Sequence, residues 1–166
     1  MSASKRFTQA VWRAFQAQKG HDANSFGHLV VTDAKPGRVW AEMKVERHQI
    51  NRLSGLHGGL IASLVDTMGS LALASRGLYM TGVSTDMSQT FVRGAKLGET
   101  VRIQSELVNM GKTLAYTRIE LHSAESGKLL AFGSHTKYIA DALKSPRNVT
   151  LSDDGEHILD GVEPAE

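Results

Sequence analysis

The chain contains no cysteine. It therefore lacks a disulfide framework, a thiolate zinc site and a cysteine nucleophile, and it is compatible with a reducing compartment. No apolar run approaches the roughly 20 residues that a transmembrane helix needs, so the sequence predicts a soluble protein without stable membrane insertion. With 166 residues, the chain is long enough to bury the core of a single domain without covalent cross-links.

Aromatic residues are scarce, at 6%, and neither a zinc-finger nor an RNP-type pattern occurs. The basic residues are scattered rather than grouped in runs, so we expect no nucleic-acid partner. Charge is nevertheless unevenly distributed: residues 141–166 hold seven acids and two basic residues, which leaves residues 1–140 with a net charge of about +7. This asymmetry favours an anionic partner or substrate without identifying it.

Several common catalytic motifs are also absent. The sequence has no Gly-x-Ser-x-Gly elbow, Walker loop, GxGxxG fingerprint or His-Glu-x-x-His. Serine hydrolase, NTPase, dinucleotide oxidoreductase and zincin functions therefore have no support. The seven histidines show no metal-ligand spacing with acids, and we expect neither a metal nor another cofactor.

The first 21 residues contain four basic residues and no acid, and Phe7, Val11, Ala14 and Phe15 fall on one helical face. This segment is compatible with a mitochondrial presequence. Because it is short and poor in serine, we favour an amphipathic helix over residues 1–22 that packs on the domain. We accordingly expect a cytoplasmic location, with the mitochondrion as the alternative.

The next segments predict a hairpin and one long helix. Two short strands, HLVVT and GRVWAEMKV, flank the turn Lys35-Pro36-Gly37. A polar loop over residues 46–56 follows, and apolar residues then recur at helical spacing over residues 58–76 before Gly77 ends the pattern.

From Gly82 onward the hydrophobic period changes from that of a helix to that of a strand. Four strands are predicted, in VSTDMSQTFV, ETVRIQSELVNM, KTLAYTRIELHS and KLLAFGSHTKYIA. Short connections make the last three antiparallel neighbours. We expect an α+β domain over residues 23–140, with a curved antiparallel sheet of about six strands around the helix, followed by an acidic, loosely ordered tail over residues 141–166.

One carboxylate, Asp66, interrupts the apolar residues of the long helix. The large side chains of this helix fall in one arc, and the opposite face carries small residues instead of Lys, Glu or Arg. We expect a second surface, most simply another copy of the chain, to cover that face. Asp66 is then either a structural carboxylate bonded to neighbouring groups or a general base or nucleophile.

His57, Gly58 and Gly59 start the same helix. Its first N–H groups have no partner within the helix and lie at the positive end of the helix dipole, so they can hold a carbonyl oxygen that gains negative charge. The alternative is that the glycines allow close packing against a strand and that His57 is a polar surface residue. In combination with Asp66, the glycine pair favours acyl transfer.

These motifs form one specific pattern along the chain. It runs Asn51-x-x-x-Gly55-x-His57-Gly58-Gly59, then Asp66, then GVSTDMSQTFVRGAKLGE, GKTLAYTRIEL and GKLLAFGSHTKYI. Over residues 5–140, the chain closely resembles the hotdog-fold acyl-coenzyme A thioesterases, and among them the acyl-CoA thioesterase 13 branch (thioesterase superfamily member 2) of the phenylacetate-pathway type. The resemblance implies hydrolysis of acyl-CoA thioesters by a homodimer with active sites between the subunits, commonly assembled into a homotetramer.

The resemblance also implies roles for individual residues. Asp66 corresponds to the acid that activates the attacking water or attacks the thioester itself, Ser84 helps to place the water, and His135 is a further site residue. The backbone N–H of Gly58 polarises the thioester carbonyl, with Asn51 and His57 in the same pocket. The residues matched to substrate and coenzyme A binding are Arg47, Ser84, Asp86, Phe91, Val92, Arg93, Gly94, Ala95, Lys96, Asn109, Met110, Gly111, Lys112, Thr113, Leu114 and Tyr138.

One departure from the family pattern and two competing functions remain. Arg93 and Gly94 stand where close relatives often have Ser-Pro, which alters the turn that grips the nucleotide. A hotdog dehydratase or hydratase would need a histidine paired with an acid at the helix start, and Asp66 lies too far along the helix. A non-catalytic acyl-CoA-binding protein would keep the fold without the chemistry. The sequence does not specify whether the acyl group is a medium-chain, long-chain or aryl-acyl group.

Overall fold

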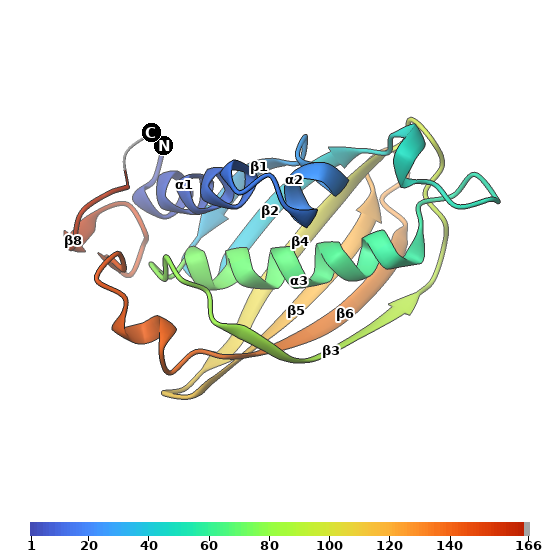
Figure 1. The fold of residues 1–166 in the computed structure, drawn as a ribbon. Coiled ribbons are helices and arrows are strands. Elements are labelled where there is room, and N and C mark those ends of the chain that lie inside the picture. Colours follow the sequence, from blue (N-terminus) through green and yellow to red (C-terminus); the bar gives the residue numbers. More distant parts are fainter. Residues whose placement is uncertain (165–166) are drawn as a thin grey trace.

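A curved antiparallel sheet wraps around one long helix in the computed structural model, which describes residues 1–164 (Figure 1). The helices are α1 (Ala3–Ala17), α2 (His21–Phe26) and α3 (Gly58–Ala74), with short 3-10 helices η1 (Arg47–Gln49) and η2 (Ala142–Lys144). The strands are β1 (Val30–Lys35), β2 (Arg38–Lys44), β3 (Val83–Phe91), β4 (Thr100–Met110), β5 (Leu114–Ser123), β6 (Leu129–Tyr138), β7 (Thr150–Leu151) and β8 (Ile158–Asp160). No helix within the described residues is long and apolar enough to cross a membrane.

The six long strands are ordered β1-β2-β4-β5-β6-β3, and every neighbouring pair is antiparallel. The predicted α+β class and sheet are thereby confirmed. β3 does not pair with β2 or β4, its neighbours in sequence. It pairs only with β6, so it lies at an edge of the sheet. Nearly all of β3 is exposed, and this edge becomes important for the site.

Helix α3 fills the concave side of the sheet with side chains that are almost completely buried. Leu64, Val65, Met68 and Leu71 are all 0% exposed and belong to the main core cluster. Each such burial stabilises the fold by roughly 1.5–3 kcal/mol relative to an exposed side chain. The helix ends at Ala74, two residues before the predicted end, because the chain then turns at Gly77 with a φ of 95°.

Helix α1 packs on the domain, as the favoured interpretation of the N-terminal segment expected. Phe7, Val11 and Trp12 are buried in the same core as α3. The predicted helix over residues 1–22 is wrong in one respect: it is interrupted near Lys19, which has a φ of 52°, and α2 then starts at His21. The cellular compartment stays a prediction.

The expectation of a loosely ordered tail is wrong for residues 141–164. These residues form η2 and the β7–β8 hairpin, and backbone hydrogen bonds join Ser4 N–H to Gly155 O (2.9 Å) and Val149 N–H to Gly77 O (2.9 Å). The acidic composition concealed a few apolar residues that pack on the core, among them Ala142 and Val149, which are both buried. Residues 165 and 166 lie outside the described part of the chain.

Candidate active site

Three of the predicted site residues meet in one hydrogen-bonded cluster. The hydroxyl of Ser84 donates to Oδ1 of Asp66 over 3.1 Å, and its oxygen lies 2.8 Å from Nε2 of His135. The same Nε2 lies 3.3 Å from Oδ1 of Asp66. If His135 carries its proton on Nε2, the three groups form a directed chain of donors that ends on the carboxylate.

The three residues come from three different elements. Asp66 lies in the middle of α3, Ser84 near the start of β3, and His135 on the adjacent strand β6. The register of β3 against β6 shifts between Ser84 and Asp86, which marks a β-bulge beside the cluster. Such bulges reorient side chains at sheet edges, and here Ser84 meets a residue of α3.

His135 is the buried member of the cluster, with a side chain that is 0% exposed. Burial, together with the positive charge of Lys137, lowers the pKa of His135 from 6.5 to about 4, although Asp66 opposes the shift. The second ring nitrogen, Nδ1, has no hydrogen-bond partner among the described residues. A neutral imidazole with its proton on Nε2 fits both observations, because an imidazolium would need an acceptor at Nδ1 as well.

Gly69 allows His135 to lie this close to α3. A Cβ at Gly69 would be 2.6 Å from Nδ1 of His135 and 2.7 Å from Oγ1 of Thr117. The hydroxyl of Thr117, on β5, also donates to the carbonyl oxygen of His135 over 3.0 Å. Sequence reasoning missed both residues, and the only signal was a glycine inside an otherwise strong helical pattern.

Lys137 is a third residue that the sequence did not single out. It follows His135 by two positions on β6, so its side chain points to the same face of the strand. It is 3% exposed, and its ammonium donates a hydrogen bond to Oγ of Ser70. The available signal was a lysine at an inward position of an alternating strand.

The start of α3 is arranged differently from the Asp66 cluster. His57 is the N-cap, and its Nδ1 accepts a hydrogen bond from the N–H of Gly59 over 2.9 Å. The N–H of Gly58 is not hydrogen-bonded within residues 1–164. Asn51 holds the preceding loop, because its Oδ1 accepts hydrogen bonds from the N–H groups of Leu53 and Gly55 at 2.8 and 3.2 Å.

Gly58 and Asp66 are not brought together within one chain. They are separated by about 12 Å along the helix axis, since each residue of an α-helix rises about 1.5 Å. A Cβ at Gly58 would lie 3.3 Å from the ring of Phe91, at the end of β3, whereas Asp66 contacts Ser84 near the beginning of β3. The donor at the helix start and the acid therefore lie beside opposite ends of the same edge strand.

The two segments matched to coenzyme A binding are also at opposite ends of the chain's sheet. Residues 91–96 lie beside the loop before α3, where the N–H of Leu56 donates to the carbonyl of Ala95 over 2.7 Å. Residues 109–114 span the end of β4, the turn and the start of β5, at the lower left of Figure 1 and far from the end of β3. This turn lies beside Tyr138, which pairs with both Leu114 and Val83.

All but one of the remaining matched positions are on the surface. Arg47 on η1 and Asp86 on β3 are exposed, as are Val92, Arg93, Gly94 and Lys96, whereas Ala95 is buried. The roles of all these residues stay predictions. No group of three or more His, Cys, Asp or Glu side chains within residues 1–164 is placed to hold a metal ion, and the expectation that no cofactor is used also stays a prediction.

The two halves of the small-residue face of α3 differ in exposure. From Gly69 and Ser70 onward it is buried against the chain's own sheet, which corrects the expectation that another copy covers the whole face. Nearer the helix start it remains accessible, and the side chain of Asp66 is 48% exposed. Only this first half needs a second surface.

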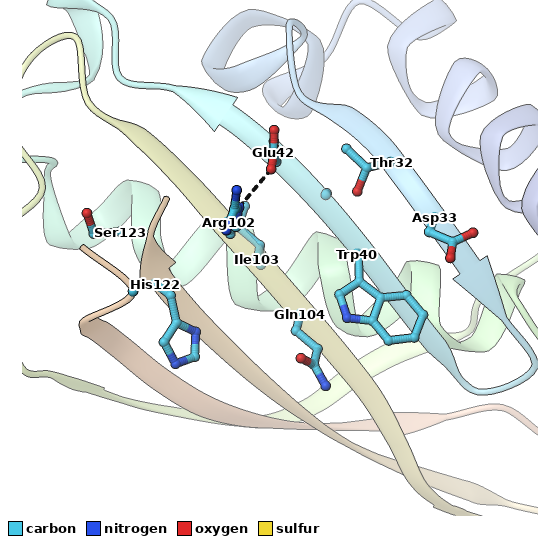
Figure 2. A pocket seen from close by; sticks show the side chains of 11 residues that line it. Thr32, Asp33, Trp40, Glu42, Arg102, Ile103, Gln104, His122 and Ser123 are labelled. Atoms are coloured by element: carbon cyan, nitrogen blue, oxygen red, sulfur yellow. Dashed lines mark hydrogen bonds and ion pairs between the residues drawn. The ribbon is translucent and has the colours of Figure 1, made fainter. Parts of the chain in front are cut away.

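A separate hollow of about 550 Å³ lies on the outer face of the sheet, away from α3. Figure 2 shows that Trp40, Gln104 and His122 line it, with the 2.9 Å ion pair between Arg102 and Glu42 at one side. The core side chains of these strands point the other way. This hollow contains none of the predicted catalytic residues.

Comparisons with known proteins agree with this geometry. Residues 54–130 match the family described as thioesterase superfamily. The chain is 41% identical over 143 residues to a putative esterase of Schizosaccharomyces pombe (86% of this chain, 88% of that one) and 43% identical over 115 residues to acyl-coenzyme A thioesterase 13 of Homo sapiens (69% and 82%). The crystal structure of zebra fish thioesterase superfamily member 2 matches with a TM-score of 0.72 at 38% identity, over 77% of this chain and 92% of that one.

Proposed function

The chain belongs to the thioesterase superfamily and has its hotdog fold, and we propose that it hydrolyses acyl-CoA thioesters to a free acid and coenzyme A. The contact of Asp66 with the hydroxyl of Ser84 carries the proposal. It orients a half-exposed carboxylate at the only accessible part of the small-residue face of α3 within residues 1–164. A carboxylate held in this way can bind and activate a water molecule.

The reaction follows from the groups that the chain supplies. Asp66 accepts a proton from water, and the water oxygen attacks the thioester carbon. The oxygen of the carbonyl gains negative charge, which the free N–H of Gly58 stabilises at the positive end of α3. The C–S bond then breaks, and the sulfur of coenzyme A takes the proton from Asp66. Direct attack by Asp66 on the carbonyl, followed by hydrolysis of the anhydride, gives the same products.

Two copies of the chain are needed to complete this site. Val83, Met87 and Phe91 leave 66%, 38% and 54% of their surfaces exposed along β3. Antiparallel pairing of β3 with its copy about a two-fold axis covers this edge and extends the sheet. It also places the beginning of one β3, with Asp66 beside it, next to the end of the partner strand, where Gly58 lies. We therefore propose a homodimer with sites between the subunits, and its assembly into a homotetramer.

The same pairing unites the two coenzyme A segments. Arg93 and Lys96 at the end of one β3 would lie near Lys112 in the β4–β5 turn of the other subunit. Three cations around one cleft suit the phosphates of coenzyme A. The acyl group then lies along the small-residue face of α3, where a medium-chain, long-chain or aryl-acyl group has apolar surroundings.

The test is thiol release from acyl-CoA substrates of increasing chain length and from aryl-acyl-CoA, followed with a thiol reagent. Asp66→Asn keeps the size of the side chain and removes the base, so we expect kcat to fall by at least about 100-fold. Binding of acyl-CoA without thiol release by the unaltered protein would instead support a non-catalytic binding protein. Full turnover by Asp66→Asn would remove Asp66 from the mechanism.

A further inference from the structure

Lys137 is a buried lysine next to the cluster that contains Asp66. Its side chain is 3% exposed, and Ser70 is its hydrogen-bond partner on α3. Ser70 lies one helical turn after Asp66, so the ammonium is close to the carboxylate without contacting it. No ion pair of Lys137 is present among the described residues, although exposed lysines such as Lys144 do form one.

A desolvated ammonium with one neutral partner is costly for a fold. Burial lowers the pKa of Lys137, and the negative charges of Asp66 and Asp22 oppose this shift. If this position only filled space, an apolar side chain of similar length would serve without the cost of desolvation. The buried charge of Lys137 therefore indicates a role in the site.

Four titratable groups surround this ammonium or the imidazole next to it. Asp66 faces it from α3 and Asp22 from α2, while His135 lies on its own strand and Asp86 faces His135 from β3. The carboxylate of Asp22 is already hydrogen-bonded to the hydroxyl of Thr67 at 2.9 Å. Of the two acids that face Lys137, Asp66 is therefore the one that takes part in the proposed reaction.

We propose that Lys137 is a positioning residue of this site, whose buried ammonium, held by Ser70 one helical turn after Asp66, supplies a fixed positive charge beside the cluster of Asp66, Ser84 and His135. The inference rests on the proposed role of Asp66 as the base. This charge disfavours a second positive charge on the imidazole of His135, two positions earlier on the same strand. It leaves the Nε2–H of His135 free to donate to Ser84, and Ser84 free to donate to Asp66.

The first experiment compares the pH dependence of kcat/KM in the unaltered protein and in Lys137→Met. Activity is expected to rise with pH as the imidazole of His135 loses its proton. Without the ammonium the imidazole is expected to gain its proton at higher pH, so the acid limb should move upward by about 0.5 pH unit or more. Lys137→Arg keeps the positive charge and is expected to keep the limb near its original position.

The matched control is Lys128→Met. It makes the same change of net charge in an exposed lysine just before the other end of β6. A limb that moves equally in Lys128→Met would assign the effect to net charge and overturn the proposal. If Lys137→Met does not fold, Lys137→Gln replaces it, since its amide can still donate to Ser70.

The second experiment needs no turnover. The imidazole of His135 is titrated by NMR in the unaltered protein and in Lys137→Met, and its pKa is expected to rise by about 0.5 pH unit or more when the neighbouring cation is removed. Folded Lys137→Met with an unchanged acid limb and an unchanged His135 pKa would overturn the proposal. Absence of thiol release from every acyl-CoA would contradict the proposed function, while the His135 titration would still report on the charge of Lys137.

Discussion

Nε2 of His135 and Oδ1 of Asp66 lie 3.3 Å apart, yet the first side chain is 0% exposed and the second is 48% exposed. The pair therefore spans the boundary between the core and the accessible half of α3. The buried imidazole of His135 fixes the geometry of the pair, and the half-exposed carboxylate of Asp66 is accessible to substrate. Each of the following predictions depends on one part of this arrangement.

The buried imidazole should make stability depend on pH. The pKa of His135 is lowered from 6.5 to about 4 in the folded chain, so between these values the unfolded state binds a proton that the folded state does not. Stability then rises with pH in this window and is lost as the pH falls, by up to about 3 kcal/mol. Urea unfolding at several pH values measures this slope, which His135→Gln should reduce. An equal slope in both proteins would contradict the assignment.

Gly69→Ala should lower activity more than stability alone explains. Alanine normally favours a helix by about 1 kcal/mol over glycine, but here its Cβ would be 2.6 Å from Nδ1 of His135. The imidazole must move and lose its contact with Ser84, so we expect kcat to fall by about 10-fold or more. Gly20→Ala is the control, because no atom lies within 4 Å of a Cβ at that position. Unchanged kcat in folded Gly69→Ala would show that the site tolerates a shifted His135.

A charge on the β3 edge should separate the subunits. Met87 lies in the middle of β3 and is 38% exposed, so Met87→Asp places a carboxylate beside its own copy in the proposed pairing. We expect a smaller species by size-exclusion chromatography with light scattering, together with loss of thiol release. Val162→Asp, at a residue that is 84% exposed in the C-terminal segment, should retain both assembly and activity. A dimer that persists in Met87→Asp would place the interface elsewhere.

Two defective chains should restore activity when they are mixed. Asp66→Asn removes the base, and Asn51→Asp removes an amide donor while it keeps the oxygen that accepts from Leu53 and Gly55. In a site shared between subunits, a heterodimer carries one doubly altered and one intact site, so random mixing should recover about a quarter of the unaltered activity. Chains refolded together from urea give the measurement, with each variant refolded alone as the control. No recovery would indicate that each chain forms its own complete site.

Hydrophobic periodicity was sufficient to predict most of the fold. The starts of α3 and β3 were predicted at Gly58 and Val83, where the structure has them. Alternation and short turns were sufficient to predict the antiparallel strands, because burial of one face of a strand imposes a period of two on the sequence. The tail was mispredicted since average composition does not register a few well-placed apolar residues such as Val149.

By itself, the sequence determined the elements, the family and the presence of an acid in an apolar helix, since these depend on neighbours along the chain. Only the tertiary structure decided which groups surround that acid. The contacts of Gly69 with His135 and of Ser70 with Lys137 join residues 66 and 67 positions apart. They depend on how α3 is rotated and shifted against β6, and that arrangement is set by packing of the whole core rather than by local pattern.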